Sequence, residues 1–282
     1  MAVKDSGALG LLNKIANSAP ISVENTVLGE DGLLYCSVCG KPRQCKINAL
    51  GVERVVNCIC QCEIDRLKEE EEHRKKIEFE RKVDRYRKMG FPDTDMVNWT
   101  FEKDDGLNPK ITSAMRSYVE HFEEFKAEGK GLLLYGDVGT GKSYAAACVA
   151  NELISRGVPC LVTNFARLAN TLQGLYEGKQ EYIDSLDRFD LLIIDDLAAE
   201  RNTEYMQEQV FNIINARYVA GLPMIITTNL TGEELKSPDS LSKERIYSRI
   251  LERCHPISIK GSDRRRNKLK EEHSRMKDIL GV

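Results

Sequence analysis

The stretch GLLLYGDVGTGKSYAAACVANELISR, residues 131–156, decides the fold of this chain. It begins with a short apolar segment typical of a buried strand, and residues 142–156 are typical of a helix. Between them, Gly136 to Ser143 fits the pattern G-x-x-x-x-G-K-[ST] in full. Its glycines let the loop wrap tightly, so that backbone N–H groups face one anion, and the free N–H groups and dipole of the helix add to this. The stretch therefore predicts a phosphate-binding loop between a strand and a helix.

The residue types of this P-loop indicate a nucleoside triphosphate bound together with Mg²⁺. We expect Lys142 to reach the β- and γ-phosphates, and the hydroxyl of Ser143 to ligate Mg²⁺. A glycine turn that carries Lys-Ser by chance is the alternative, but the strand before and the helix after it disfavour that alternative. The residues expected to bind ATP are Gly136, Asp137, Val138, Gly139, Thr140, Gly141, Lys142, Ser143 and Tyr144.

Outward from the loop, short apolar strands alternate with helices. Strands are predicted at 131–135, 160–163, 191–195, 223–228 and 255–260. Helices are predicted at 142–156, 165–176, 204–219 and 245–253. Short, continuous apolar strands separated by helices of this length predict an α/β fold with a parallel sheet covered on both faces. Cys148, Cys160 and Cys254 fall in these elements and are expected in the core.

The segment LLIIDDL, residues 191–197, is the second half of the predicted site. A carboxylate at the C-terminal end of a buried strand lies at the sheet edge where ligands bind in open α/β folds. We expect Asp195 to hold Mg²⁺, directly or through water, and Asp196 to orient the attacking water. Glu200 is close in sequence and could share this task. A helix cap or a turn is the alternative, which the P-loop upstream disfavours.

Asn229 follows the fourth predicted strand, in the sequence Thr-Thr-Asn. Its amide could lie beside the γ-phosphate, because the expected strand order sets Asn229 next to Asp195. Without that neighbour, Thr-Asn after a strand would indicate no more than a turn.

Taken together, the P-loop, the Asp pair, the Thr-Thr-Asn strand end and the C-terminal arginines resemble the AAA+ ATPases of the DnaC/DnaI helicase-loader branch. The resemblance covers roughly residues 90 to 266, and DDLAAE is especially like the DnaI side. The cysteine-bearing N-terminal part resembles phage- or mobile-element-encoded DnaC-like proteins. The resemblance implies an AAA+ sheet with a reduced C-terminal lid, since only some twenty residues follow the last strand. It also implies that Asn229 is the sensor 1 residue.

Two arginine roles follow from the same resemblance. Arg249 would be the arginine finger that reaches a neighbouring subunit's γ-phosphate, with Arg245, one helical turn earlier, as the second choice. Arg265 would be the sensor 2 arginine that contacts the nucleotide, and Arg264 and Arg266 compete for this role. Arginine suits both roles because its planar fork neutralises charge that develops on phosphoryl oxygens. A solvated basic surface is the alternative interpretation of these arginines.

Six of the nine cysteines fall between residues 36 and 62. The spacing Cys36-x-x-Cys39 followed by Cys58-x-Cys60-x-Cys62 offers two close ligand sets about twenty residues apart. Tetrahedral Zn²⁺ takes four thiolates or imidazoles, and this stretch contains no histidine, so the predicted site is all-cysteine. An iron–sulfur cluster could use the same ligands. The segment has too few apolar residues to fold alone, which indicates a structural metal.

The choice of ligands rests on resemblance to a C-x-C pair that ends before a charged helix. Cys58 is the closest substitute within the set, and Cys45 is expected to be a free thiol. The expected zinc ligands are Cys36, Cys39, Cys60 and Cys62.

Composition and charge bear on DNA binding, on cellular location and on the division into domains. The 41 basic and 44 acidic residues nearly cancel, so that any DNA site must be a local patch. No apolar run or leader of the usual kind is present, which predicts a cytoplasmic protein without a membrane. We expect a zinc-binding, helicase-interacting domain at 1–62, with a short helix near residues 11–15. A charged helical linker at 63–90 and the AAA+ domain at 91–282 would follow.

The resemblance implies an ATPase that loads the replicative DNA helicase onto single-stranded DNA during replication initiation or restart. It would self-associate in the ATP state through the finger, and hydrolysis to ADP would release the assembly. An IstB-like transposition helper ATPase acting on duplex DNA is the alternative. A small-molecule kinase would need a substrate lid and an acceptor site. A zinc adaptor with an inactive ATPase remnant is disfavoured by the intact Lys142, Ser143 and Asp195.

Overall fold

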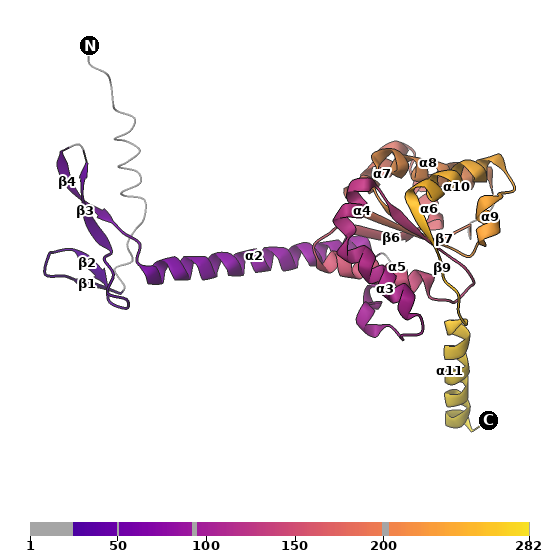
Figure 1. The fold of residues 1–282 in the computed structure, drawn as a ribbon, viewed down its shortest axis with the longest axis horizontal. Coiled ribbons are helices and arrows are strands. Elements are labelled where there is room, and N and C mark those ends of the chain that lie inside the picture. The colour runs from indigo at the N-terminus through magenta and orange to yellow at the C-terminus, as the bar shows by residue number, and fades with distance from the viewer. Residues whose placement is uncertain (1–24, 50, 92–94, 199–202, 282) are drawn as a thin grey trace, which may run out of the picture. The chain divides into compact units, whose positions relative to one another are not determined.

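The computed structural model describes residues 25–49, 51–91, 95–198 and 203–281 (Figure 1). The helix expected near residues 11–15 and the carboxylate of Glu200 lie outside these described residues. The chain divides into two compact units, Met1–Glu78 and Phe79–Val282. Within the described ranges, every helix is too short or too polar to cross a lipid bilayer.

The first unit contains two short antiparallel hairpins. In one, β1 (Thr26–Leu28) pairs with β2 (Leu34–Cys36). In the other, β3 (Gln44–Ala49) pairs with β4 (Val52–Asn57). Two-stranded hairpins are marginally stable in water by themselves. Among the described residues of these hairpins and the turns around them, the buried side chains are those of Cys36, Arg43 and Cys60, so apolar packing contributes little here.

The long helix α2 (Gln61–Gly90) occupies the position of the predicted charged helix and begins two residues earlier. Ion pairs one turn apart run along it, such as Arg66 with Glu70 and Lys75 with Glu71, both at 2.7 Å. Each such exposed pair contributes about 0.2–0.5 kcal/mol. Gly90 ends the helix, where an added Cβ would lie 2.4 Å from the carbonyl oxygen of Cys160.

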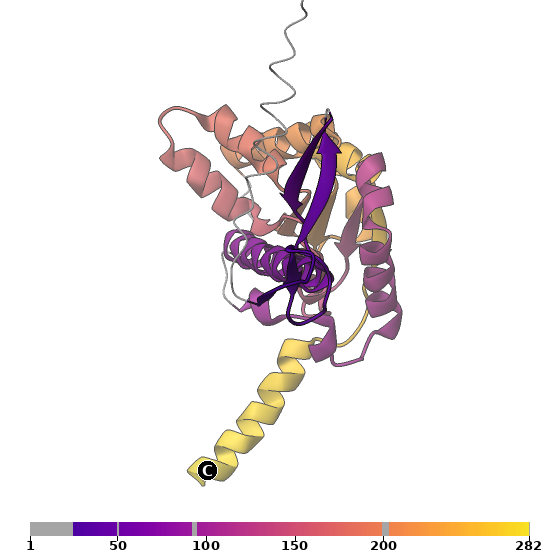
Figure 2. The ribbon, with the colours of Figure 1, turned by 90° about the vertical axis from the view of Figure 1, so that its left-hand side faces the viewer.

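The second unit is built on a five-stranded parallel sheet (Figures 1 and 2). Its strands are β5 (Gly131–Tyr135), β6 (Cys160–Asn164), β7 (Leu191–Leu197), β8 (Met224–Thr228) and β9 (Cys254–Ser258). The order across the sheet is β6-β7-β8-β5-β9, and every neighbouring pair is parallel. The predicted strands are confirmed, with bounds that differ by at most two residues.

Helices cover both faces of this sheet (Figure 2). The predicted helices are present as α5 (Lys142–Ser155), α6 (Phe165–Gly174), α8 (Glu204–Ala220) and α10 (Leu241–Arg253). Helix α10 begins four residues before its predicted start, because Ser240 caps it by accepting a hydrogen bond from the N–H of Lys243. The sequence did not predict α3 (Pro109–Glu120), α4 (Phe122–Glu128), α7 (Lys179–Ser185), α9 (Gly232–Lys236) and α11 (Arg264–Leu280).

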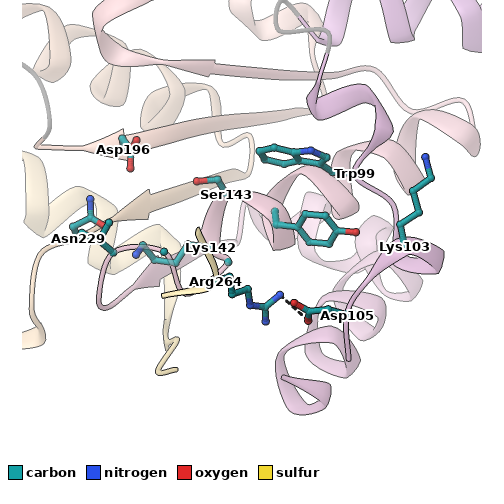
Figure 3. Close-up of a pocket in the computed structure, with 12 residues that line it drawn as sticks. Trp99, Lys103, Asp105, Lys142, Ser143, Asp196, Asn229 and Arg264 are labelled. Carbon is teal, nitrogen blue, oxygen red and sulfur yellow. Dashed lines mark ion pairs between the residues drawn. The ribbon is translucent and has the colours of Figure 1, made fainter. Parts of the chain in front are cut away.

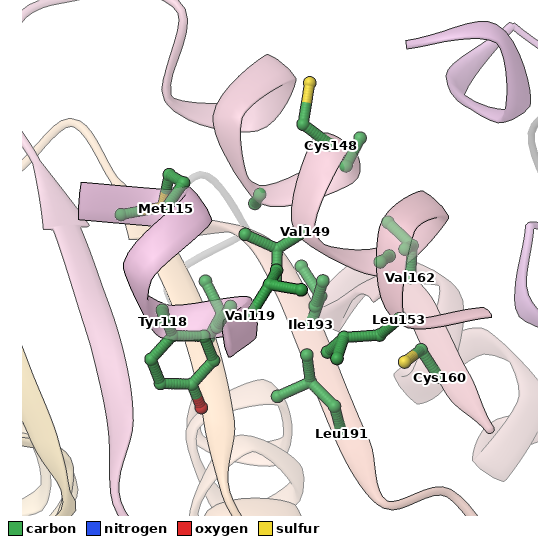
Figure 4. Packing of buried hydrophobic residues seen from close by; sticks show 14 of the residues in the cluster. Met115, Tyr118, Val119, Cys148, Val149, Leu153, Cys160, Val162, Leu191 and Ile193 are labelled. Carbon is green, nitrogen blue, oxygen red and sulfur yellow. The ribbon is translucent and has the colours of Figure 1, made fainter. Parts of the chain in front are cut away.

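Alternate residues of each strand enter two separate apolar clusters. Leu132 and Leu134 belong to the cluster with α3 and α5, whereas Leu133 belongs to the cluster with α6, α8 and α10. Figure 4 shows the first cluster, in which Val119 and Val149 approach Ile193 of β7. This alternation is what a parallel sheet covered on both faces requires. The three cysteines expected in the core are buried, which raises the pKa of their thiols.

A buried arginine ties the helix layer to the strand ends. Arg217 of α8 is 1% exposed, and its guanidinium donates hydrogen bonds to the carbonyl oxygens of four residues: Leu186, Phe189, Asp190 and Pro223. Its ion pair with Asp187 measures 3.4 Å. Burial lowers the pKa of Arg217 to about 10, so that the side chain stays charged at neutral pH.

We expect Arg217→Ala to lower the free energy of unfolding by about 3 kcal/mol, because it leaves buried carbonyl groups without donors. Urea unfolding followed by the fluorescence of Trp99, the chain's sole tryptophan, measures this. Arg156→Ala is the control, since Arg156 is 40% exposed and forms only surface ion pairs, worth less than about 1 kcal/mol. Equal losses in both variants would contradict the structural role of Arg217.

Candidate functional site

The predicted phosphate loop joins β5 to α5, as the sequence requires. Gly136 has a φ of 135°, and an added Cβ would lie 2.4 Å from the carbonyl oxygen of Ile259. Gly141 has a φ of 96°, and a Cβ there would lie 3.1 Å from the guanidinium carbon of Arg264. Positive φ disfavours larger residues at both positions, and at Gly136 the backbone carbonyl of Ile259 also excludes a Cβ. The segment after β9 therefore packs directly against the loop.

Lys142 is the first residue of α5 and is only 5% exposed. Its ammonium group donates hydrogen bonds to the carbonyl oxygens of Gly136, at 2.8 Å, and Asp137, at 2.6 Å. The hydroxyl of Thr140 donates to the same carbonyl of Asp137, at 2.9 Å. The ammonium is thus held against the backbone of the loop, where phosphate oxygens are the stronger acceptors for a charged donor.

A pocket of about 390 Å³ opens beside the loop (Figure 3). Eight residues predicted from the sequence line it: Val138, Gly139, Gly141, Lys142, Ser143, Tyr144, Asp196 and Asn229. Arg264, a competing candidate for the sensor 2 role, also lines it, together with three residues that the sequence did not indicate: Trp99, Lys103 and Asp105. The pocket therefore joins the phosphate loop, the ends of β7 and β8, and the segment before α3.

The two predicted carboxylates lie at an irregular end of β7. The register between β7 and β8 shifts between Ile194 and Leu197, and Asp196 has a φ of 57°. A residue other than glycine in this left-handed region costs about 1–3 kcal/mol and is held there by its surroundings. The surrounding group here is Thr227, which the sequence did not indicate.

Thr227 connects both aspartates. Its hydroxyl accepts the backbone N–H of Asp196, at 2.9 Å, and donates to a carboxylate oxygen of Asp195, at 2.6 Å. Thr227 is fully buried, so this arrangement is shielded from water. Asp196 lines the pocket, whereas Asp195 is turned to Thr227 and is absent from the described residues of the lining. The strand order places Asn229, which follows β8, on the same pocket as Asp196, whereas the sequence predicted it next to Asp195.

An aromatic pair lies at the other end of the pocket (Figure 3). The rings of Trp99 and Tyr144 stack with centroids 5.7 Å apart and planes inclined by 29°. Tyr144 donates its hydroxyl to the carbonyl of Thr100, at 2.9 Å, and burial raises its pKa to about 12, so the hydroxyl remains a donor. Asn151 donates to the carbonyl oxygens of Met96 and Trp99, both at 2.9 Å. These bonds fix the segment that carries Trp99 onto α5.

Arg264 brings a positive charge to the pocket. Its backbone N–H donates to the carbonyl of Gly139, at 2.9 Å, and its guanidinium pairs with Asp105, at 2.9 Å, and more distantly with Asp104. Arg266 is instead 81% exposed and pairs with Asp263. Arg265 belongs to α11, but its side chain lies outside the described residues, so its nucleotide contact stays a prediction.

The two candidates for the arginine finger lie on α10. Arg249 donates to the side chain of Asn215, at 3.0 Å, and its guanidinium lies 4.8 Å from the ring centre of Phe211. Arg245 is exposed, and its carbonyl accepts a hydrogen bond from Arg249. Neither arginine is among the described residues that line the nucleotide pocket of their own chain.

The first unit contains the cysteine cluster. The sulfur atoms of Cys36, Cys39, Cys60 and Cys62 all lie within 4.8 Å of one another, which is the set of four selected from the sequence. With Zn–S bonds of about 2.3 Å, a tetrahedral site needs sulfur atoms about 3.8 Å apart, so this group fits a zinc ion. Cys58 lies elsewhere, with its sulfur 2.7 Å from that of Cys45.

The thiols of the cluster differ in how readily they ionise. A hydrogen bond from the backbone N–H of Lys41 lowers the pKa of Cys39 to about 6. The neighbouring Cys39 in turn raises the pKa of Cys62 to about 12. Thiols this close compete for ionisation, and a divalent cation that binds all four sulfurs as thiolates removes the competition.

Comparison with known proteins gives the family. A model of IstB-like ATP binding proteins matches residues 58–272, which include the P-loop, both aspartates and the arginines. The chain belongs to the IstB-like ATP-binding family. It thus carries an ATP-binding AAA+ domain, as the resemblance implied.

Relatives of this IstB-like chain include helicase loaders. The replicative helicase loader DnaI of Bacillus subtilis is 27% identical over 213 residues, covering 68% of this chain and 66% of DnaI. The loader DnaC of Escherichia coli is 28% identical, covering 54% of this chain and 61% of DnaC. A putative ATP-binding protein in an insertion sequence of Mycobacterium tuberculosis is 26% identical, covering 60% of this chain and 69% of that protein. The chain thus spans less than two thirds of the length of both loaders.

A solved structure agrees with this relationship. The crystal structure of DnaI superimposes with a TM-score of 0.51 at 27% identity, covering 64% of this chain and 99% of that one. The parallel five-stranded sheet with a P-loop is therefore shared with a helicase loader at the level of the fold.

We expect ATP or ADP to change the fluorescence of Trp99, because the indole lines the nucleotide pocket and is the chain's sole tryptophan. Titration of the full chain with nucleotide measures the effect. Lys142→Ala should abolish the response by removing the phosphate contact, whereas Lys110→Ala, an exposed lysine of α3, should leave it unchanged. If Lys142→Ala responded at the same nucleotide concentrations as the wild-type chain, the assignment of the pocket would be contradicted.

Proposed function

We propose that this IstB-like protein is an ATPase that loads the replicative DNA helicase onto single-stranded DNA, during replication initiation or restart in the cytoplasm. The observation that carries the proposal is the similarity to DnaI, in sequence over 213 residues and in fold over nearly the whole crystal structure. The name of that relative states the function, and the P-loop pocket supplies the means to use ATP.

Different residues of the pocket would contact different parts of the nucleotide. Bound Mg²⁺ would neutralise charge on the phosphates, held by Ser143 and Asp195. Lys142 would exchange the loop carbonyl oxygens for phosphate oxygens, since charge-assisted bonds are stronger. Asp196 would orient the attacking water, and Asn229 would hold it or the γ-phosphate from the neighbouring strand end.

Base and arginine contacts complete the proposed site. Trp99 would stack on the adenine, because its ring is fixed against Tyr144 at the end of the pocket opposite the ends of β7 and β8. Arg264 would leave Asp105 for the phosphates and so take the role for which Arg265 was selected. Arg265 remains the alternative.

Arg249 would act on the nucleotide of a neighbouring subunit. Its side chain lies on the α8–α10 surface, held by Asn215 and Phe211, and is not directed into its own pocket. An arginine fixed in this way can complete the site of another copy, which makes hydrolysis depend on self-association in the ATP state.

The first unit would contact the helicase. We propose that residues 1–62 form a zinc-binding domain, that residues 63–90 are the linker, and that residues 91–282 form the AAA+ domain. Zn²⁺ on the four converging cysteines would stabilise the two hairpins, which have few buried apolar side chains of their own.

We expect Arg249→Ala to bind ATP as the wild type does, with an unchanged Trp99 response, but to lose ATP hydrolysis by at least about 100-fold. It should also lose ATP-dependent assembly, measured by light scattering. Arg245→Ala is the comparison and should retain most of both activities.

Mixing two inactive variants tests whether the arginine acts between subunits. A Lys142→Ala subunit would not bind ATP but would supply Arg249 to its neighbour. An Arg249→Ala subunit would bind ATP but would supply no arginine finger. Recovery of hydrolysis in the mixture is the expected result, because one composite site then contains both parts. Wild-type turnover in Arg249→Ala alone would refute the finger assignment.

Affinity capture from the native host tests the partner. The tagged full chain, with and without ATP, should recover the hexameric replicative helicase, identified by mass spectrometry. A chain that lacks residues 1–62 but retains the Trp99 response to ATP should fail to do so. Recovery of a transposase in place of a helicase, or of no partner, would contradict the loader proposal.

The alternative function is a transposition helper that acts on duplex DNA. The matching IstB-like family model and the relative in an insertion sequence favour this function specifically. Binding assays with ATP separate the two proposals, because a loader should prefer single-stranded DNA and the helper should prefer duplex DNA.

A further inference from the structure

Arg43 is a buried cation in a unit with almost no interior. It is 8% exposed, and it belongs to the turn between β2 and β3. Its backbone N–H donates to the carbonyl of Leu34, at 2.7 Å, and its carbonyl accepts the N–H of Cys58, at 2.7 Å. The backbone of Arg43 is therefore fixed from both sides.

The guanidinium of Arg43 is directed at the cysteine cluster. Its Nη1 atom donates to the sulfur of Cys60, at 3.8 Å, and its Nε atom is buried without a hydrogen-bond partner in the described part of the chain. Glu63, the nearby carboxylate on α2, is bonded to Arg66. A buried cation is strongly unfavourable unless an anion compensates it. The charge of Glu63 acts on both Arg43 and Arg66, and the cluster sulfurs, as thiolates, would supply further anions beside Arg43.

The charge of a metal-loaded cluster matches this need. Four thiolates around one Zn²⁺ carry a net charge of −2. The positive end of the α2 dipole is a second source of positive potential near this sulfur. Helix α2 begins directly after Cys60, whose carbonyl accepts the N–H groups of Glu63 and Ile64. The sulfur of Cys60 thus lies at a helix N-terminus, where negative charge is stabilised.

We propose that Arg43 is the counter-cation of the four-cysteine metal centre. Its N–H group hydrogen-bonds the Cys60 thiolate, and its charge offsets half of the net charge of the zinc–thiolate group. This inference rests on the metal site proposed above, and it concerns metal retention, not ATP hydrolysis. Arg43 acts as a positioning residue: it holds the Cys60 sulfur and links both hairpins to the metal through its backbone bonds.

Zinc affinity of the full chain, measured by competition with a chromogenic chelator, tests the proposal. Arg43→Met keeps the length of the stem but removes the charge, and we expect it to bind zinc about 10- to 100-fold more weakly. Lys46→Met is the matched control, since it removes one positive charge from an exposed side chain of β3. Its affinity should stay within about twofold of the wild type, because exposed charges are screened.

Cobalt substitution supplies a readout that a merely structural role would not move. An N–H donor lowers the energy of the thiolate lone pair, so its loss should shift the thiolate-to-Co²⁺ charge-transfer band to longer wavelength in Arg43→Met and not in Lys46→Met. Equal zinc affinities and identical cobalt spectra in the two variants would overturn the role of Arg43.

Two further results keep the test decisive. If Arg43→Met does not fold, Arg43→Lys replaces it: the charge remains but the fork of donors is lost, so the band should shift with a smaller loss of affinity. An unchanged band and affinity in that variant would overturn the proposal. A wild-type chain that binds no zinc would overturn the metal site as well, whereas the Trp99 response to ATP reports separately on the nucleotide pocket.

Discussion

The proposed nucleotide site depends on one close contact, between the backbone of Gly136 and the carbonyl of Ile259. This contact fixes the phosphate loop against the segment that follows β9, and that segment then delivers Arg264 to Gly139 and Gly141. Because β5 lies between β8 and β9, the loop has the polar end of β8 on one side and this arginine on the other. One sterically tight contact thus gathers groups from distant parts of the chain at one edge of the sheet.

The left-handed conformation of Asp196 is held by Thr227 of the neighbouring strand. The left-handed turn of Asp196 breaks the register of β7 and directs its side chain into the pocket, and the buried hydroxyl of Thr227 satisfies both the strained N–H and the carboxylate of Asp195. A threonine on one strand therefore determines the directions of two carboxylates on the next. Unlike valine, which has the same shape, threonine supplies the donor and acceptor that this role needs.

Local patterns account for what the sequence could predict. The strands, the helices α5, α6 and α8, and the four-cysteine set each depend on residues close in sequence or on a fixed ligand spacing, and they are found where expected. The roles of Trp99 and Thr227, and the placement of Arg264, which the resemblance offered only as a competitor of Arg265, depend instead on which strands and loops become neighbours. Trp99 reaches the pocket only because Asn151 and Tyr144 anchor its segment to α5. No periodicity or spacing marks such contacts in advance.

Both units contain a buried cation that needs an anion to compensate its charge. Lys142 and Arg43 are each more than nine-tenths buried; Lys142 donates to backbone carbonyl oxygens, and Arg43 donates to the sulfur of Cys60. The carbonyl oxygens that hold Lys142 are neutral, and phosphate would displace them, whereas the sulfur atoms near Arg43 would carry negative charge as metal ligands. An anion stabilises a buried cation more than neutral hydrogen-bond acceptors do. In the AAA+ unit that anion would come and go with the nucleotide, and in the first unit it would stay, as part of the structure.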